Sequence, residues 1–377
     1  MTPSDSFSPH PAKSPLAIAV VLPQFHPIPE NDRWWGKGFT EWTNVVKAQP
    51  LFPGHEQPRL PGELGFYDLR LPEARAAQAD LARQHGIGGF CYYHYWFNGH
   101  SLLERPVDDI VRLGEPKFPF CLCWANENWT RAWDGRQRDV LMEQHYGPED
   151  DEAHIASLLP YFADPRYIRI DGKPLFIVYK VANLPDPGRT FELWRRRARE
   201  AGIGEICLAQ FEAMGLGTAP DPRTVGLDFS IEFAPDWRSL GGRHAVTWRA
   251  RLAMALGLVP KAFGQHFVHE YDAMVARVQA KPAPDYPLVR CVSPGFDSSP
   301  RRPLRNAVIL RHSTPQAYGR WLRWAADWAV QHPVASRPLV FVNAWNEWAE
   351  GNHLEPCARH GRAYLEATAA ALDAAGT

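Results

Sequence analysis

The chain has 377 residues, of which 45% are hydrophobic, and its formal net charge is -1 at pH 7. This length and apolar content are typical of a soluble enzyme with one large domain or two ordinary ones. The balanced charge gives no electrostatic reason to expect nucleic acid or an anionic membrane as a partner.

The predicted elements begin after a polar, Pro-rich stretch at 1–15, which is typical of a disordered tail and not of a signal peptide. Apolar runs predict strands at 16–22, 88–95, 118–124, 174–179, 206–210, 227–233, 287–292 and 338–342. Helical patterns occur at 72–85, 102–113, 149–162, 190–201, 271–280, 315–331 and 362–374. A mainly helical insertion is expected around 237–285, and no apolar run is long enough to cross a membrane.

This alternation predicts an α/β fold in which residues 16–377 form a single (β/α)8 TIM barrel with long βα loops. The other reading is a pair of doubly wound domains that bind a nucleotide sugar. It needs a Gly-rich phosphate loop after a strand, whereas Gly86, Gly88 and Gly89 precede one. The barrel is therefore favoured.

Cysteine and tryptophan usage each carry a prediction. Five of the six cysteines fall in apolar runs without CxxC spacing, which predicts buried free thiols and suits a cytoplasmic location; these are Cys91, Cys121, Cys123, Cys207 and Cys291. The 15 Trp residues often stand beside Gly, Asn or Glu. They either fill a large core or line a groove in which indole faces stack on sugar rings. We favour the groove, and hence an oligosaccharide or polysaccharide as the substrate.

In such a barrel the functional residues stand at the C-terminal ends of the strands and in the loops that follow. Nearly every predicted strand end is polar or aromatic. The candidate substrate-binding residues are His26, Trp35, Glu41, Trp42, Tyr93, His94, Trp96, Trp124, Asn126, Glu127, Trp129, Lys180, Glu232, Asp297, Trp345, Asn346, Trp348 and Glu355. Taken one at a time, an aromatic residue among them is as consistent with core packing as with sugar stacking.

The last predicted strand runs into Glu347 and Glu350, which are the candidate catalytic residues. Two carboxyl groups can supply the acid and the base or nucleophile of glycosidic cleavage. Residues three apart face opposite ways on a strand, but they lie on one side if the chain turns helical there. The second acid could instead be Glu41, Glu127 or Glu232, and acids at a strand end could also simply cap the next helix.

The sequence predicts no cofactor and no metal site. His26, His94 and His353 lie on different segments without HxH or HExxH spacing. A nucleotide-sugar transferase would commonly clamp a diphosphate through a DxD-type metal site. The paired acids at 108–109 and 150–151 fall in or at the start of predicted helices, where solvated acids are the simpler interpretation.

Several long strings resemble the WbsX-type family of bacterial polysaccharide-biosynthesis proteins, which is related to glycoside hydrolase family 99. They lie at 22–32, 34–44, 57–61, 67–69, 124–129 and 345–351, and the resemblance runs from about residue 17 to 365. It implies a (β/α)8 barrel and a role in O-antigen-type surface glycan or lipopolysaccharide biosynthesis. It names no protein partner.

Family 99 cleaves α-mannosides with retention, and its Asn-Glu-Trp-x-Glu-Gly motif is similar to residues 346–351 here. In that family the first Glu is thought to take a proton from the sugar 2-hydroxyl, which closes a 1,2-anhydro intermediate, and the second protonates the leaving oxygen. By motif position these roles fall on Glu347 and Glu350. This chain has Ala349 where the endomannosidases carry His. Hydrolysis, transglycosylation, transfer from a nucleotide sugar and non-catalytic carbohydrate binding remain open.

Overall fold

The computed structural model describes residues 14–131, 136–213, 217–241, 248–258 and 260–375. The predicted disordered tail at 1–15 lies outside the described residues apart from its last two positions. Within the described ranges, no helix has the length and apolar character needed to cross a bilayer.

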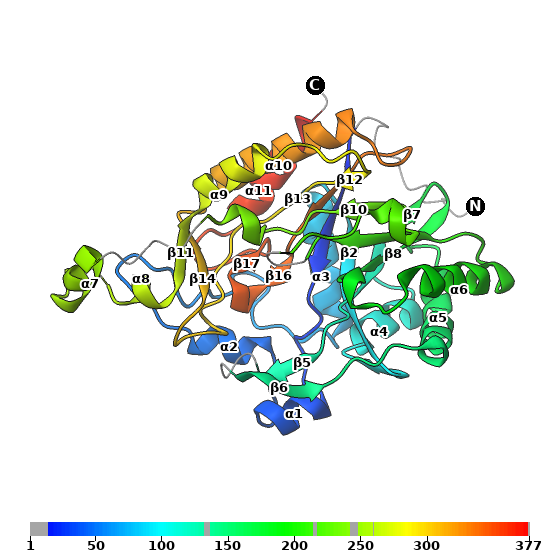
Figure 1. Ribbon diagram of the computed structural model, residues 1–377, viewed down its shortest axis with the longest axis horizontal. Helices are drawn as coiled ribbons and strands as arrows, with labels where there is room; N and C mark the ends of the chain where they lie inside the picture. Colours follow the sequence, from blue (N-terminus) through cyan, green and yellow to red (C-terminus); the bar gives the residue numbers. More distant parts are fainter. Residues whose placement is uncertain (1–13, 132–135, 214–216, 242–247, 259, 376–377) are drawn as a thin grey trace.

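The described chain forms a closed barrel of parallel strands (Figure 1). Around the barrel the order is β1 (Leu16–Val21), β2 (Ile87–Phe97), β4 (Phe120–Trp124), β8 (Lys173–Val178), β9 (Cys207–Phe211), β10 (Phe229–Ile231), β12 (Leu288–Val289) with β13 (Cys291–Val292), and β15 (Leu339–Val342), which pairs with β1. Strands β12 and β13 are two parts of one interrupted strand, because β12 pairs with β10 and β13 with β15. This strand closes the ring, so the predicted (β/α)8 barrel is confirmed.

Helices pack around the barrel. They are α3 (Pro72–Gln84), α4 (Arg105–Leu113), α5 (Pro148–Phe162), α6 (Pro187–Glu200), α9 (Tyr271–Gln279), α10 (Pro315–Gln331) and α11 (Ala363–Asp373). Most begin with Pro in the first turn, where the missing N–H costs nothing. In α10 the Thr314 side chain also accepts a bond from the Ala317 N–H. Local sequence thus sets where these helices start.

The loops carry further elements. These are α1 (Pro29–Trp35), α2 (Glu41–Lys47), β3 (His100–Leu102), β5 (Trp129–Arg131), β6 (Arg136–Met142), β7 (Arg169–Ile170), α7 (Trp248–Ala255), α8 (Ala262–Gln265), β11 (Phe267–Glu270), β14 (Val308–Arg311), β16 (Asn346–Glu347) and β17 (Asn352–His353), with 3-10 helices η2 (Val181–Asn183), η3 (Pro222–Val225), η4 (Trp237–Ser239) and η5 (Trp348–Glu350). Helices α7 and α8 stand out from the barrel at the left of Figure 1.

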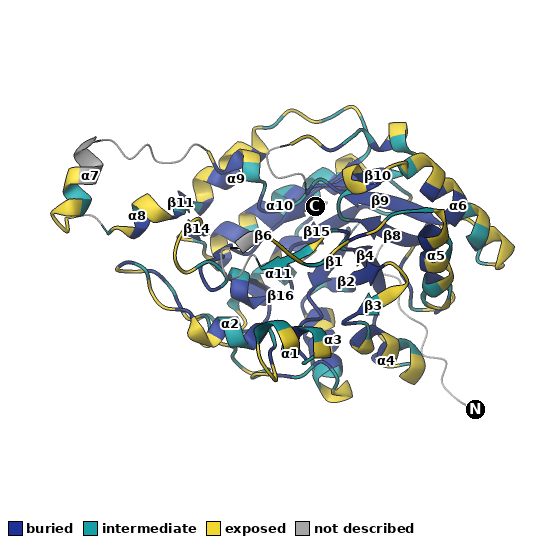
Figure 2. Ribbon diagram, turned by 60° about the horizontal axis from the view of Figure 1, so that its bottom comes forward, coloured by how far each residue is buried: buried dark blue, intermediate teal, exposed yellow. Residues whose placement is uncertain are grey.

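The core is continuous through the barrel and out to the helices. Every residue of β1, β4, β9 and β15 is buried, as expected for parallel strands covered on both faces. Figure 2 shows these buried strands surrounded by helices that expose only their outer faces. All six cysteines are buried free thiols, which confirms the prediction made for five of them.

Two predictions about the elements are wrong. The helix expected at 102–113 begins at Arg105, because Asn98 and Gly99 adopt positive φ and turn the chain back so that β3 pairs with the end of β2. The insertion around 237–285 contains strand β11, whose partner β14 lies far ahead in sequence. The β9–β10 connection, for which no helix was predicted, has only the 3-10 helix η3 among its described residues.

Candidate active site

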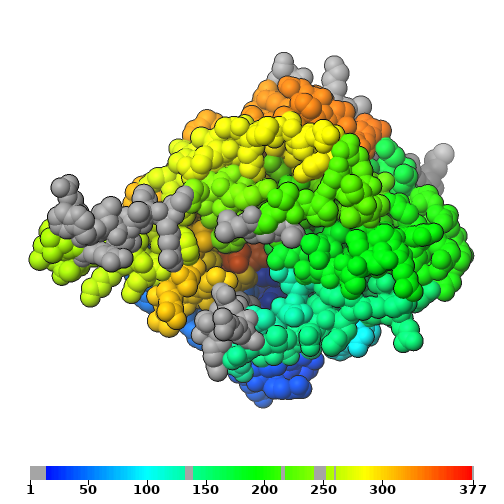
Figure 3. Space-filling model, in the orientation of Figure 1, coloured from blue at the N-terminus to red at the C-terminus, as the bar shows by residue number. Residues whose placement is uncertain are grey.

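A cavity of about 850 Å³ opens at the C-terminal ends of the barrel strands. In the space-filling view it is the hollow at the centre of the face shown in Figure 3, with parts of the N-terminal and C-terminal segments visible at its bottom. Its wall includes Glu347 and Glu350, which therefore lie where a barrel enzyme keeps its functional groups.

The two carboxylates sit on one tight turn. Strand β16 ends at Glu347 and the 3-10 helix η5 ends at Glu350. Side chains three residues apart eclipse one another in a 3-10 helix, so Glu347 and Glu350 emerge on the same side. Gly351 then adopts φ 56°, a left-handed conformation that favours glycine, and turns the chain into β17. Of the two arrangements that the sequence left open, the structure has the helical one.

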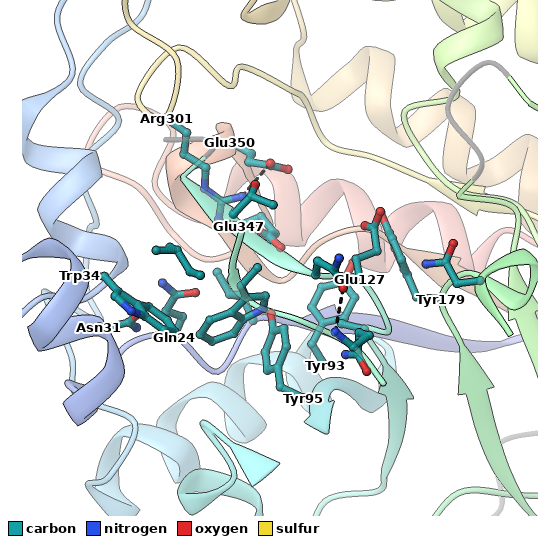
Figure 4. Close-up of a pocket in the computed structure, with 18 of the residues that line it drawn as sticks. Gln24, Asn31, Trp34, Tyr93, Tyr95, Glu127, Tyr179, Arg301, Glu347 and Glu350 are labelled. Carbon is teal, nitrogen blue, oxygen red and sulfur yellow. Dashed lines mark hydrogen bonds and ion pairs between the residues drawn. The ribbon is translucent and has the colours of Figure 1, made fainter. Parts of the chain in front are cut away.

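Both carboxylates meet one guanidinium, that of Arg301, as Figure 4 shows. Arg301 Nη2 donates to Glu347 Oε2 at 2.9 Å, and Nη1 donates to Glu350 Oε1 at 2.7 Å. A third carboxylate, Glu41, accepts from Nε at 3.0 Å and from Nη2. The Arg301 side chain is 14% exposed and Glu41 is 0% exposed. One largely buried cation is therefore bonded to three acids.

The balance of forces in this cluster favours the protonated form of Glu347. Burial raises the pKa of Glu347 to about 8, because the lost hydration and the nearby Glu350 and Glu41 outweigh the attraction of Arg301. Burial also raises the pKa of Glu41 in spite of its bonds to Arg301. Burial opposes the charge on Arg301, but the three acids hold its pKa well above its ordinary value. The pair can thus keep one neutral acid near neutral pH.

A buried network holds the turn from behind. Glu355 accepts hydrogen bonds from Trp348 Nε1 at 2.6 Å and from the Tyr67 hydroxyl at 2.8 Å. Trp348, which separates the two carboxylates in sequence, also stacks on His353 with ring centroids 3.7 Å apart. Burial raises the pKa of Glu355 to about 7. Glu355 thus bonds Trp348 and Tyr67 behind the turn, and it is not among the residues that line the cavity.

The other side of the turn is tied to the loop after β13. The Asp297 N–H donates to the Glu350 carbonyl at 2.5 Å, and the Asp297 carboxylate accepts from His55 at 2.7 Å and from Gln57 at 2.6 Å. Burial would raise the pKa of Asp297, but the bonds and charge of His55 hold it below its usual value. Arg59 donates to the Gly351 carbonyl at 2.6 Å. These contacts fix the backbone on which the two acids stand.

Aromatic rings form much of the remaining wall. Trp129 lies edge-on to Tyr95 and Trp34, with ring centroids 5.1 and 5.9 Å apart, and Trp35 and Tyr93 also line the cavity. Burial keeps the pKa of the Tyr93 and Tyr95 hydroxyls well above the ordinary value, so both remain neutral donors. Figure 4 shows Glu127 across the cavity from Arg301. Rings beside acids suit a sugar ligand, which has apolar faces and hydroxyl edges.

The comparison with known proteins fits this geometry. The family model described as Glycosyltransferase WbsX matches residues 17–368. The chain belongs to the WbsX family. WxcX proteins from two strains of Xanthomonas campestris pv. campestris are 46% identical over 359 residues, which cover 94% of this chain and 49% of those proteins. The chain thus spans about half the length of these curated relatives.

Solved structures share the barrel. A glycoside hydrolase-like protein aligns with a TM-score of 0.60 and 13% identity over 97% of both chains. The family 99 endo-α-mannosidase from Bacteroides thetaiotaomicron aligns with a TM-score of 0.50 and 17% identity over 95% of this chain and 96% of its own. At these identities the likeness shows the fold alone. The resemblance to WbsX-type proteins and to the family 99 barrel is therefore confirmed.

Among the residues expected to bind substrate, three line the cavity beside the two carboxylates or opposite them: Trp35, Tyr93 and Trp129. Glu127 also lines it and forms an ion pair with Lys180, which anchors that wall. Glu41 is fully buried behind Arg301 and does not reach the cavity. The sequence predicted that Glu41 binds the substrate, whereas in the structure its carboxylate binds the Arg301 guanidinium.

Five predicted Trp platforms lie in the core instead of the cavity wall. Trp42, Trp96, Trp124, Trp345 and Trp348 are all buried, and they are not among the described lining residues. Trp96, for example, donates to Asp150 at 2.9 Å and stacks on His154. Successive residues of a strand point to opposite faces, so Tyr93 and Tyr95 face the cavity while His94 and Trp96 face α5.

The remaining polar candidates are structural in this arrangement. His94 contacts His154 at 3.0 Å, and burial lowers its pKa to about 4; burial does the same to His26, whose Nδ1 lies 3.1 Å from the Pro23 carbonyl. Asn126 pairs with the Lys180 backbone, and Asn346 with that of Leu22. Glu232 accepts from Arg290 at 2.5 Å, and burial raises its pKa. Asp297 and Glu355 brace the turn from outside the cavity.

Several lining residues were missed by the sequence reasoning, notably Gln24, Asn31, Trp34, Tyr179, Phe233 and Arg301. Trp34 stands next to Trp35 inside one of the WbsX-like strings, so a signal for it existed. Arg301 lies between Pro300 and Pro303 in a long loop, where nothing local marks it. Its role depends on contacts with residues 46 to 260 positions away.

No group of three or more His, Cys, Asp or Glu side chains arranged to hold a metal ion occurs among the described residues. Whether the reaction needs a metal stays a prediction, which chelation can test.

Proposed function

We propose that this chain is a glycoside hydrolase or transglycosidase that acts on bacterial surface polysaccharide, with Glu347 and Glu350 as its catalytic carboxyl groups. One observation carries the proposal: the two acids stand on a single turn in an open cavity, each bonded to Arg301. A pair of carboxyl groups in one cavity can deliver and remove protons on either side of a glycosidic bond.

The aromatic wall supports a sugar as the ligand. Trp129, Tyr93 and Tyr95 offer ring faces and neutral hydroxyls near the acids. A cavity of about 850 Å³ can enclose a short stretch of oligosaccharide. The relatives' family description and the fold neighbours' titles both name carbohydrate-active proteins, which favours the same class of substrate.

The proposed retaining reaction proceeds in two steps. A base removes the proton from the sugar 2-hydroxyl, whose oxygen attacks C1 as the bond from C1 to the leaving oxygen breaks. The leaving oxygen takes a proton from the acid of the pair. The resulting carboxylate then deprotonates water or an acceptor hydroxyl, whose oxygen attacks C1 while the 1,2-anhydro ring opens and O2 regains the proton held by the base.

Motif position suggests Glu347 as the base and Glu350 as the acid. The raised pKa of Glu347, to about 8, means that this carboxyl holds a proton in the empty cavity at neutral pH. The base role therefore requires Glu347 to lose that proton before it accepts one from the sugar. Activity should then rise with pH toward about 8 if Glu347 is the base, and fall there if it is the acid.

A nucleotide-sugar glycosyltransferase is the second candidate, because the family carries that description. The cavity wall contains Glu127, Glu347 and Glu350 together with Arg301 and Arg302, and Arg301 is already bonded to three carboxylates. The carboxyl pair in the cavity favours the hydrolase or transglycosidase. The chain spans about half the length of its curated relatives, so the proposed activity concerns this chain and not the whole of those proteins.

The test is incubation of the purified chain with a panel of 4-nitrophenyl glycosides and, separately, of nucleotide sugars with polysaccharide acceptors. We expect released nitrophenol that disappears in the Glu350→Gln variant. Release of nucleotide from a nucleotide sugar, with no glycoside cleaved, would overturn the proposal and favour the transferase.

A further inference from the structure

Arg301 reaches the carboxylate pair from a different part of the barrel. It lies in the loop between β13 and β14, whereas Glu347 and Glu350 follow β15 and Glu41 is the first residue of α2. All three of its guanidinium nitrogens donate hydrogen bonds to these acids. Nη1 donates to Glu350, Nη2 to Glu347 and Glu41, and Nε to Glu41. A planar guanidinium is suited to such simultaneous contacts because its donors are fixed in a fork.

Helix α2 supplies the fixed end of this arrangement. The Glu41 N–H donates to the Gln24 carbonyl at 3.0 Å, and the neighbouring Trp42 packs on Trp348 with ring centroids 5.7 Å apart. The Glu41 side chain is fully buried, so it cannot touch a ligand in the cavity. Its carboxylate accepts from Arg301, and the backbone N–H of Ala349, on the turn that carries Glu347 and Glu350, also hydrogen-bonds it.

We propose that Arg301, oriented by Glu41, is a positioning residue that holds one oxygen of Glu347 and one oxygen of Glu350 and so aims both carboxyl groups at the ligand. A carboxyl group has two oxygens, so one can be held while the other exchanges a proton with a sugar. This inference rests on the proposed function, because it assigns Arg301 a task within the same reaction.

The charge count supports a role beyond neutralisation. One cation faces three acids, so a fully ionised cluster would remain negative, and burial opposes that charge. Simple neutralisation of the pair would need no fourth group, yet Glu41 takes two of the guanidinium's bonds. The other titratable groups that face the cluster are Tyr93 and Tyr95 from β2, Tyr179 after β8, Arg302 beside Arg301, and Glu127 across the cavity.

The test compares Arg301→Ala, Arg301→Lys and Glu41→Gln with Arg305→Ala, a matched control from an exposed part of the same loop. We expect Arg301→Ala to lower kcat on a cleaved glycoside at least about tenfold with KM changed less than about threefold, since the loss falls on proton transfer. Added guanidinium should restore part of kcat in Arg301→Ala, whereas ammonium should not. Arg301→Lys should stay slow because one ammonium cannot bond three carboxylates in fixed directions.

A second readout needs no activity. In protein with ¹³C-labelled glutamate side chains, the titration midpoint of Glu347, identified with Glu347→Gln, should rise by about one pH unit or more in Arg301→Ala. It should not change in Arg305→Ala. Far-ultraviolet circular dichroism checks that each variant is folded. If Arg301→Ala does not fold, the titration is measured in Arg301→Lys instead.

The outcomes separate the two proposals. If the wild-type chain cleaves no glycoside, the proposed function fails, while an upward-shifted Glu347 titration still supports the contact between Arg301 and the pair. Wild-type kcat in Arg301→Ala, or full recovery in Arg301→Lys, would overturn the positioning role. An unchanged Glu347 titration in a folded Arg301→Ala variant would overturn it as well.

Discussion

The burial of Glu347 predicts an unusual dependence of stability on pH, which the Glu347→Gln variant isolates. Burial raises the pKa of this carboxyl from 4.5 to about 8. At about 1.4 kcal/mol for each unit of pKa, ionising Glu347 inside the fold costs roughly 5 kcal/mol more than in the unfolded chain. Glu41 and Glu350 contact the same guanidinium, so protonation in the cluster is coupled and roughly 5 kcal/mol is an upper bound for the effect of Glu347 alone.

The sign follows from which state binds the proton. Below pH 4.5 the folded and unfolded chains both hold it, and Glu347 contributes no pH dependence. Between 4.5 and about 8 the folded chain keeps the proton that the unfolded chain has lost, so the free energy of unfolding falls as pH rises. A glutamine at this position cannot ionise. Relative to wild type, the Glu347→Gln variant should therefore gain stability steadily from pH 5 to pH 8.

Urea denaturation followed by fluorescence at several pH values between 5 and 8.5 measures this difference. Glu73→Gln, which alters an exposed glutamate of α3, is the control and should follow the wild type throughout. If the ion pair with Arg301 outweighed burial, the pKa of Glu347 would lie below 4.5, and the difference in unfolding free energy between the variant and wild type would be nearly constant above about pH 5. The reasoning is refuted if the difference in unfolding free energy between Glu347→Gln and wild type stays constant with pH, or if the variant becomes less stable than wild type as pH rises.

The remaining predictions concern activity and binding. Glu347→Gln and Glu350→Gln should each lower turnover at least about a hundredfold while Glu73→Gln leaves it unchanged, and near wild-type turnover in either would contradict the role of that residue. Trp129→Ala should weaken oligosaccharide binding in calorimetry by roughly 1–3 kcal/mol. Trp324→Ala, on α10 against Arg290, should not, and equal effects would argue against a sugar-stacking wall. Activity should survive EDTA and trace a bell against pH, whereas chelator inhibition reversed by Mn²⁺ would favour the transferase.

Local patterning explains how much of the fold could be predicted. All eight predicted strands occur, because a parallel strand buried on both faces must be a short apolar run, and the loop prolines and glycines mark its ends. The wrong predictions concern strands that pair with a partner distant in sequence, or strands whose formation depends on a tight turn. Strand β11 depends on a partner at β14, and β3 depends on the turn at Asn98 and Gly99.

For the site, the sequence was sufficient to single out Glu347 and Glu350 as candidates, but it left open whether a strand or a helical turn carries them and whether Glu41, Glu127 or Glu232 is the second acid. The sequence could not distinguish the aromatic residues that line the cavity from those that are buried in the core. Trp129 and Trp348 both stand beside Asn or Glu in similar strings, yet only Trp129 lines the cavity, while Trp348 is stacked on His353 behind the turn. That distinction depends on which face of the barrel each side chain meets.

The sequence by itself therefore determined the barrel and the family and proposed Glu347 and Glu350 as candidates, because these signals come from residues that are close together along the chain. Only the tertiary structure decided that Arg301 and Glu41 belong to the same cluster, because they lie 260 positions apart and meet across the top of the barrel. The protonation of Glu347 is likewise a property of the folded chain. It arises from the water excluded around the carboxyl and from the charges that distant loops bring beside it.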